Sequence, residues 1–459
     1  MSTPSPLSGT NPLSPTATTT LLRSTLRDRT AGVILGSALG DAIGLYTEFL
    51  SAALSAEAYP SGKFTLTGTP PTPFKLDSHR APKEPGHWTD DTDHALLLLL
   101  AFLHTAKTGD AKENEVVPLP TQQEFAARLR VWVQQGFPPL GTMPLGLGRL
   151  VGSVVSSKGF DIDPESVARG YWERTGKRVA PNGSLMRTHP LGVICLVRGE
   201  TEAFEVAAGI SRVTHVDPRC VVACVIGTGL VRAVVRGEVQ GEGDVDALVE
   251  RAVQWYRDGG RANDEGELDL EELQKHVNPE GGLDGLKIDD APTIGYVYKT
   301  LGSGVVLLRM AIRRMALNRG LLDRSRAFED LITDLIMRGG DADTNACFAG
   351  ALLGGYLGYS ALPDHWKHGL KHEEWLLSKS DALCQVLGLV DGAYNGKEDK
   401  DTELYGGRPV ISQDEMEGRW MVLQQNTFKK MEDVAKAAAS KASGSGWSLP
   451  WHSKDKAKR

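Results

Sequence analysis

Apolar residues recur along the chain mostly with the three- and four-residue spacing of an amphipathic helix, and few segments alternate as strands do. Polar stretches separate these apolar segments, which run from Ala31 to about Val390. The pattern predicts helices at 31–45, 92–106, 122–135, 163–174, 201–213, 219–236, 245–257, 294–317, 325–337, 344–359 and 372–390. A chain with many helices and almost no strand signal is expected to form an all-α domain, here a compact orthogonal bundle of many helices.

The segments outside this pattern are polar or rich in Gly and Pro. Residues 59–87 and 258–292 are expected to be long surface loops, which in a compact domain are usually functional or disordered. Residues 1–30 are dominated by Ser, Thr and Pro and predict a disordered arm. Residues 396–459 are expected to form a C-terminal extension with one helix over 414–440 and a flexible basic tail.

Glycine recurs at every fourth position in two of the predicted helices. The positions are Gly32, Gly36, Gly40, Gly44, Gly350, Gly354 and Gly358. Residues four apart lie on one face of a helix. Because glycine costs up to about 1 kcal/mol in a helix interior, these faces are expected to approach another backbone closely. The two helices either pack on each other or share a partner.

Carboxylates and hydroxyls cluster where two of the predicted helices begin. The residues are Thr89, Asp90, Asp91, Thr92, Asp93, Asp341, Asp343 and Thr344. One Asp would suffice to cap a helix and complement its dipole. Several crowded carboxylates repel one another unless a cation lies among them. An all-oxygen set suits Mg²⁺, Mn²⁺ or Ca²⁺ rather than zinc, so we favour a metal site over capping alone.

Charge and cysteine usage narrow the class of protein. Lys and Arg total 51 against 58 Asp and Glu, which gives a formal net charge of -7. Such a chain carries no overall electrostatic signature for nucleic acid or for an anionic membrane. Five scattered cysteines without a C-x-x-C pair are typical of a reducing compartment. We therefore expect an intracellular protein, cytoplasmic or nuclear, that binds neither nucleic acid nor membrane; the Ser/Thr-rich N-terminus with its arginines leaves a mitochondrial location open.

Five separated motifs occur in an order that resembles the ADP-ribosylglycohydrolase family. They are LGDAIGLYTEF, WTDDTDHALLLL, NGSLMR, THVDPR and RGGDADTNACFAGALLGGYLGYSALPDHW. That family includes ADP-ribosyl-acceptor hydrolases and the dinitrogenase-reductase-activating glycohydrolase, and the resemblance covers about residues 31 to 370. It implies a catalytic domain at 31–395 with two Mg²⁺ ions in a central cleft, Mn²⁺ being the alternative. It also implies hydrolysis of the bond between ADP-ribose and a modified protein side chain, by a chain that we expect to be a monomer.

By motif position, the resemblance implies roles for individual residues. Glu48 falls where some members carry a mobile catalytic or gating glutamate. The implied metal ligands are Thr89, Asp90, Asp91, Asp341, Asp343 and Thr344. The implied residues of the ADP-ribose pocket are Asn182, Gly183, Ser184, Arg187 and His215.

The chemistry of the residues supports these roles and leaves alternatives for some of them. Paired cations can hold a ribose diol and polarise water, while a nearby carboxylate such as Glu48 moves a proton. Asp41, on the glycine face, is expected to cap or brace its own helix. Arg187 either neutralises a pyrophosphate or forms a structural ion pair, and a lone histidine such as His215 is more often structural.

Two other functions stay open at this stage. One is hydrolysis of a small-molecule ADP-ribosyl conjugate. The other is a catalytically silent ADP-ribose-binding protein, which the complete set of matching acids disfavours. Lys299 and the run 302–304 depart from the family's pattern, which leaves the acceptor undetermined.

Overall fold

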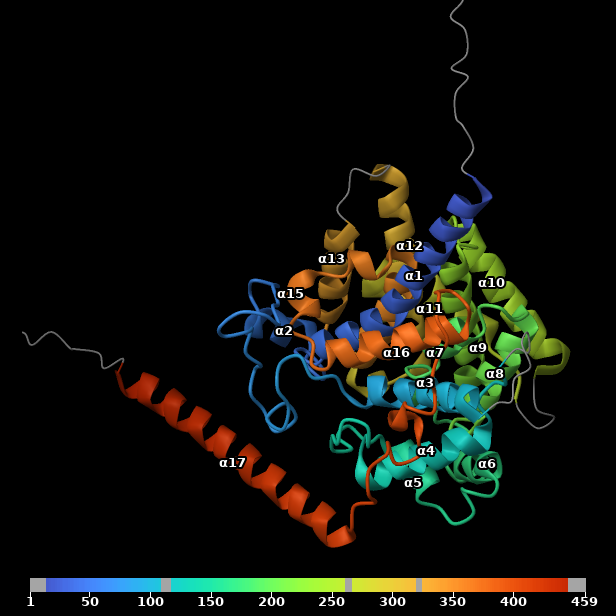
Figure 1. Cartoon of the computed structure of the whole chain (residues 1–459). Coiled ribbons are helices and arrows are strands. Elements are labelled where there is room, and N and C mark those ends of the chain that lie inside the picture. Colours follow the sequence, from blue (N-terminus) through green and yellow to red (C-terminus); the bar gives the residue numbers. More distant parts are fainter. Residues whose placement is uncertain (1–13, 109–116, 261–265, 319–323, 445–459) are drawn as a thin grey trace, which may run out of the picture. The chain divides into compact units, whose positions relative to one another are not determined.

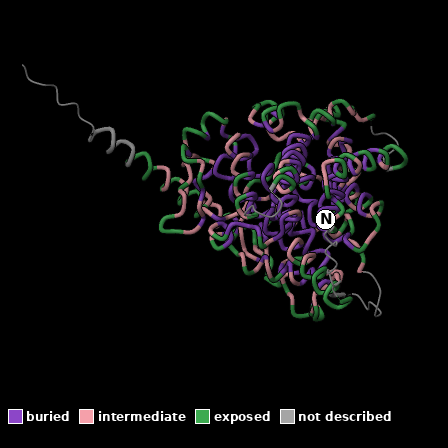
Figure 2. Tube along the Cα trace, turned by 90° about the horizontal axis from the view of Figure 1, so that it is seen from above, coloured by how far each residue is buried: buried purple, intermediate pink, exposed green. Residues whose placement is uncertain are grey.

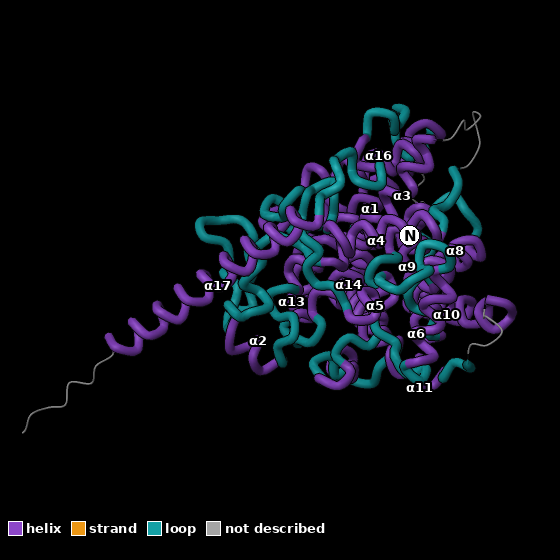
Figure 3. Tube along the Cα trace, turned by 90° about the horizontal axis from the view of Figure 1, so that it is seen from below, coloured by secondary structure: helices purple, strands orange, loops and turns teal. Residues whose placement is uncertain are grey.

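The computed structural model describes residues 14–108, 117–260, 266–318 and 324–444. Within these ranges the chain consists of helices and connecting loops, and none of them contains a strand (Figures 1 and 3). The β-bridges found there are isolated residue pairs. The prediction of an all-α fold is confirmed.

The first half of the described chain contains α1 Pro15–Gly44, α2 Ala52–Ala58, α3 Asp90–Thr108, α4 Gln122–Gln135, α5 Arg149–Val155, α6 Pro164–Arg174, the 3₁₀ turn η1 Asn182–Ser184, α7 His189–Ile194, α8 Glu200–Arg212 and α9 Pro218–Arg236. The second half contains α10 Glu242–Trp255, α11 Leu270–Val277, α12 Val297–Asn318, α13 Arg324–Ile336, α14 Ala342–Leu357, α15 Asp364–Lys367, α16 Glu373–Val386 and α17 Gln413–Gly444. Every predicted helix has a counterpart. The helices that periodicity missed, α2, α5, α7, α11 and α15, have eight residues or fewer, which is too short for a periodic signal.

The prediction of a disordered N-terminal arm is wrong for residues 15–30, because α1 begins at Pro15. The partners of this segment are distant in sequence: Arg27 donates two hydrogen bonds, of 2.9 and 3.0 Å, to the Asp381 carboxylate. Composition cannot reveal such tertiary contacts, which here favour a helix in a Thr-rich segment. The rest of the predicted arm, residues 1–13, lies outside the described residues.

The predicted loop at 258–292 also contains more structure than expected. It includes α11 and two 3₁₀ turns, Gly282–Leu286 and Ala291–Thr293. Residues 261–265 of this stretch lie outside the described residues. The other predicted loop, 59–87, contains no helix.

The chain divides into two compact units. The larger unit combines Met1–Pro73 with Pro85–Val410, so it extends beyond the boundary predicted at residue 395. Asp399 contributes to this extension, because the Lys379 ammonium donates to its carboxylate at 2.5 Å.

The smaller unit combines Phe74–Glu84 with Ile411–Arg459. Its main element is α17, which covers the helix expected at 414–440. Lys430 of α17 donates a hydrogen bond of 3.2 Å to the Ala81 carbonyl.

The glycine faces of α1 and α14 pack directly on each other, which is the first of the two arrangements expected from the sequence. A Cβ built on Gly40 would lie 1.9 Å from the Ala346 carbonyl oxygen, and one on Gly354 would lie 1.9 Å from that of Gly32. Any side chain at these positions would force the backbones apart. Gly358 has a different role, because it ends α14 with a φ of +93°, where glycine is favoured.

Buried residues concentrate in the interior of the larger unit (Figure 2). α9 and α14 are buried along almost their whole length. By length and composition alone α9 could cross a membrane, but 94% of its most apolar window is buried inside the protein. Burial of this kind is what a central core helix of a folded domain shows.

Candidate metal centre

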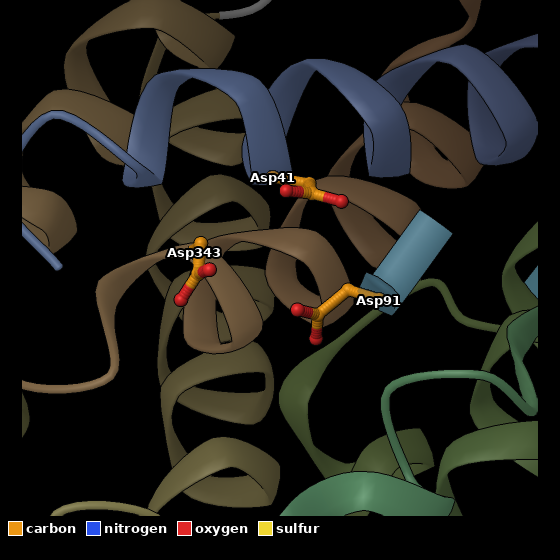
Figure 4. Close-up of side chains that lie close together, drawn as sticks. All are labelled: Asp41, Asp91 and Asp343. Atoms are coloured by element: carbon orange, nitrogen blue, oxygen red, sulfur yellow. The ribbon is translucent and has the colours of Figure 1, made fainter. Parts of the chain in front are cut away.

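Three aspartates from three helices come together beside the packed glycine faces. Asp41 lies in α1, Asp91 in the first turn of α3 and Asp343 in the first turn of α14. One carboxylate oxygen from each lies within 4.8 Å of those of the other two, and all three residues are buried. Figure 4 shows the three side chains gathered in the space between these helices.

A second group shares Asp343 and adds Asp341 and Glu48, again with carboxylate oxygens within 4.8 Å of one another. Glu48 is 6% exposed and Asp341 is 8% exposed, so this group is buried as well. Two ligands on opposite sides of a Mg²⁺ ion lie about 4 Å apart, so both spacings are compatible with a shared cation. The two acidic segments, about 250 residues apart in the sequence, therefore face each other.

The backbone next to Glu48 is hydrogen-bonded to the loop that precedes Asp341. The Phe49 N–H donates to the Gly340 carbonyl at 2.6 Å, and the Gly340 N–H donates to the Leu50 carbonyl at 2.8 Å. Phe49 has a φ of +57° and Gly340 one of +73°, a region that is costly for a bulky aromatic residue. These backbone hydrogen bonds hold the segment of Glu48 next to that of Asp341.

Asp41 has a role that the sequence did not reveal. Its carboxylate accepts hydrogen bonds from the Thr89 N–H at 2.9 Å, the Thr92 N–H at 3.1 Å and the Thr92 hydroxyl at 2.6 Å. Asp41 therefore caps α3. The sequence had suggested instead that it caps or braces its own helix, α1. Its place on the glycine face of α1 was visible in the sequence, but the partner helix was not.

Burial, and after it repulsion between like charges, raises the pKa of the carboxylates in the centre. Burial, and then the charges of Asp41 and Asp90, raise the pKa of Asp91 well above its usual value. Burial and the Glu48 carboxylate raise the pKa of Asp343 strongly and that of Asp341 to about 6.

A bound cation would relieve this repulsion. Within the described residues, Asp91, Asp341 and Asp343 have no Lys, Arg or His ion-pair partner. The Asp91 Oδ1 atom is buried without a hydrogen-bond partner. All ligand atoms in this set are oxygens, their negative charge is not balanced by a cationic side chain, and Asp91 Oδ1 lacks a partner. Such a set fits a hard divalent cation.

The other predicted ligands lie around this set. The Thr89 hydroxyl donates to Asp91 at 2.9 Å, and the Thr344 N–H donates to the Asp343 carboxylate at 2.9 Å. Asp90 is half-buried, with its carboxylate beside Gly146, and belongs to neither carboxylate group.

Asp93, also in this acidic motif, has a structural role. It accepts hydrogen bonds from the indole N–H groups of Trp88 at 2.8 Å and Trp132 at 2.9 Å. Both carboxylate oxygens of Asp93 are therefore engaged by tryptophans.

The predicted NGS turn reaches the metal centre through Asn182. The Asn182 amide donates to the Asp341 carboxylate at 2.8 Å and to the Thr300 hydroxyl at 3.0 Å. Gly183 lies next to His215, because a Cβ built on it would be 3.2 Å from the imidazole Nε2 atom. Asn182 therefore couples the turn directly to a predicted metal ligand.

Ser184 and Arg187 point into the core instead. The Ser184 hydroxyl accepts from Ser211 at 3.1 Å and from the Cys224 thiol at 3.3 Å. Arg187 is fully buried, and it has no carboxylate partner among the described residues. Arg187 thus forms no ion pair among the described residues, and its contact with ADP-ribose stays a prediction.

A cavity of about 440 Å³ lies beside the chain that leads into the NGS turn. Its walls include Trp172, Lys177, Arg178 and Arg219. The Lys177 ammonium lies 4.9 Å from the centre of the Trp172 ring, and Arg219 binds the Asp217 carboxylate at 2.8 Å. Four acidic residues, Asp217, Glu267, Asp269 and Glu272, also line the cavity, so its cationic side chains are balanced by carboxylates. Sequence reasoning did not identify these residues.

Comparison with known proteins identifies relatives of this chain. The sequence model of the ADP-ribosylglycohydrolase family matches residues 22–396. An uncharacterised protein of Archaeoglobus fulgidus is 26% identical over 365 residues, covering 79% of this chain and 97% of its own length. The ADP-ribosyl-[dinitrogen reductase] glycohydrolase of Rhodospirillum rubrum is 24% identical over 371 residues, covering 79% of this chain and 98% of its own length.

Among solved structures, an ADP-ribosylglycohydrolase-related protein complex shares 22% identity with this chain. The match has a TM-score of 0.45 and covers 79% of this chain and 99% of that one. The family match spans most of the chain and includes every motif that contributes to the carboxylate centre. The chain belongs to the ADP-ribosylglycohydrolase family.

Proposed function

We propose that this protein is a Mg²⁺-dependent hydrolase that removes ADP-ribose from a modified protein side chain. Family membership supports hydrolysis of an ADP-ribosyl linkage. The observation that carries the metal dependence is the buried carboxylate centre, whose charges have no cationic side chain to balance Asp91, Asp341 and Asp343 within the described residues.

The residues that would hold two ions are Thr89, Asp90, Asp91, Asp341, Asp343 and Thr344. When bound, the ions supply positive charge that binds ribose hydroxyls and lowers the pKa of a water molecule. Asn182 fixes the orientation of Asp341 through its amide hydrogen bond. Asp41 holds the first turn of α3, and therefore Asp91, through hydrogen bonds to Thr89 and Thr92.

Glu48 is the residue that we assign to proton transfer. It is the first carboxylate after the end of α1, and its backbone is held next to the loop of Asp341. From there its carboxylate can take a proton from water as the glycosidic bond breaks, or give one to the leaving group. Its membership of the second carboxylate group, beside Asp341 and Asp343, supports this assignment.

The proposal is tested by measuring release of ADP-ribose with and without Mg²⁺. The substrates are peptides with Ser-, Arg- and acid-linked ADP-ribose, beside ADP-ribose-1″-phosphate and O-acetyl-ADP-ribose. We expect Mg²⁺-dependent turnover of at least one peptide, lost in Asp343→Asn and retained in the control Asp163→Asn, which changes an exposed helix cap. Turnover of the small molecules alone, or turnover without any divalent cation, would contradict it.

A further inference from the structure

Three buried nitrogen-bearing side chains behind the NGS turn lack hydrogen-bond partners. Arg187 is unpartnered at Nε and Nη1, His94 at both ring nitrogens and His215 at Nε2. None of the three is more than 2% exposed. Leaving buried polar atoms unpaired costs about 1–3 kcal/mol each, so each calls for a partner that protein atoms do not supply.

The three side chains form one cluster. The Thr214 hydroxyl lies 2.7 Å from Arg187 Nη2 and 2.7 Å from His215 Nδ1, so it links these two residues directly. His94 is close enough for the charge of Arg187 to add to burial in lowering its pKa.

Aromatic residues of α4 close this cluster on one side. The Arg187 guanidinium lies 4.8 Å from the centre of the Phe125 ring, and the His94 ring lies 4.3 Å from that of Trp132. Phe125 and Trp132 are seven residues apart and share one face of α4. On the α4 side, therefore, the neighbours of Arg187 and His94 are aromatic rings.

The unpartnered atoms are mainly donors. The contact of His215 Nδ1 with Thr214 is compatible with either ring tautomer, whereas neutral His94 presents one free N–H group. The free positions on Arg187 are N–H groups as well. The missing partner is therefore an acceptor.

The charge of the cluster distinguishes an anion from a water molecule. Arg187 keeps its proton at neutral pH, because burial lowers its pKa only to about 10. The nearby thiols of Cys220 and Cys224 cannot balance it, because burial raises their pKa and keeps them neutral. A buried cation without a counter-charge is costly, and a water molecule would leave that charge in place.

We propose that Arg187, His94 and His215 enclose a small monovalent anion, chloride under cellular conditions. The anion would accept the free N–H groups and balance the guanidinium. It would also stabilise the NGS turn from behind, because Gly183 lies against the His215 ring and Asn182 of the same turn binds Asp341. The proposal is independent of the hydrolase activity and concerns a site in the protein core.

The first test uses bromide as a chloride substitute with a strong anomalous X-ray signal. Crystals of the full chain grown in sodium bromide should show one anomalous peak within hydrogen-bonding distance of Arg187 and a histidine of the cluster. A water molecule there, with no anomalous signal, would overturn the proposal. Displacement of the bromide by ADP-ribose would also overturn it, because the cluster would then belong to the substrate pocket.

The second test measures the Tm of the full chain in sodium chloride, bromide and gluconate at equal ionic strength. The wild-type Tm should be about 2–4 °C higher in either halide than in gluconate, because a ligand of the native state stabilises it. His94→Leu should lose at least half of this difference and Arg187→Met all of it. The matched control is Arg232→Met, whose buried guanidinium already donates to two carbonyls and should keep the full difference. An equal halide response in all variants would overturn the proposal; if Arg187→Met does not fold, His94→Leu and the bromide crystals decide.

Discussion

Replacing Gly40 by alanine tests whether the contact between α1 and α14 sets the geometry of the metal centre. The added Cβ would lie 1.9 Å from the Ala346 carbonyl oxygen, whereas ordinary contact begins at 3.4 Å. The atom that it meets belongs to the backbone, so no side chain can rotate away. The helices would have to separate by about 1.5 Å next to Asp41, one residue further along α1.

The expected loss of stability combines two opposing effects. Alanine favours a helix over glycine by up to about 1 kcal/mol. Overpacking a core costs about 1–3 kcal/mol, and a clash with backbone on this scale belongs at the upper end. We expect the free energy of unfolding to fall by about 2 kcal/mol. Mg²⁺ affinity should fall as well, because metal ligands tolerate displacements of only about 0.2 Å.

Urea unfolding followed by circular dichroism, together with calorimetric Mg²⁺ titration, measures both effects. The matched control is Gly243→Ala in α10, where an added Cβ meets no atom within 4 Å. That variant should be unchanged or more stable by up to about 1 kcal/mol, with normal Mg²⁺ affinity. If Gly40→Ala matches this control in stability and Mg²⁺ affinity, backbone contact does not set the spacing of the carboxylates.

Three further predictions concern the carboxylates themselves. Asp343→Asn should abolish turnover. It should nevertheless raise the Tm measured without metal, because it removes one of the mutually repelling charges. An unchanged or lower Tm in scanning fluorimetry would contradict the repulsion. Glu48→Gln should retain binding of ADP-ribose and Mg²⁺ in calorimetry but lower the single-turnover rate constant at least about 100-fold; a parallel loss of Mg²⁺ binding would make Glu48 a ligand instead. The folded-state pKa of Asp341 is raised to about 6, so the metal-free protein should lose stability as the pH rises from about 4 through 6. Mg²⁺ affinity should rise over the same range, since the carboxylate must lose its proton to bind; thermal unfolding at each pH, with and without Mg²⁺, checks both signs.

Much of the fold was predictable because the signals were local. The long helices carry their apolar periodicity within their own sequence, and the acidic residues that begin α3 and α14 stand next to that periodicity. The glycine spacing also indicated which face of α1 would approach another backbone. Asp91, Asp341 and Asp343 could therefore be selected before their proximity was known.

The features that sequence reasoning missed depend on partners distant in the chain. Residues 15–30 are helical although their composition resembles a disordered arm, and Arg27 among them binds Asp381. Asp41 could be placed on a helix face but not against α3. Arg187 was predicted to face a ligand or an acid, and only the packing of α4 over it shows that it is buried.

The hydrogen bonds that Asp93 accepts from Trp88 and Trp132 also have a spectroscopic consequence. Indole emission responds to the electric field around the ring, and these two indoles share one carboxylate two residues after Asp91 in α3. A cation that binds Asp91 changes that field without touching either ring. The chain has nine tryptophans, so replacing the other seven by phenylalanine would isolate this pair. Its intrinsic fluorescence would then report occupancy of the metal centre in real time, without a label and without turnover.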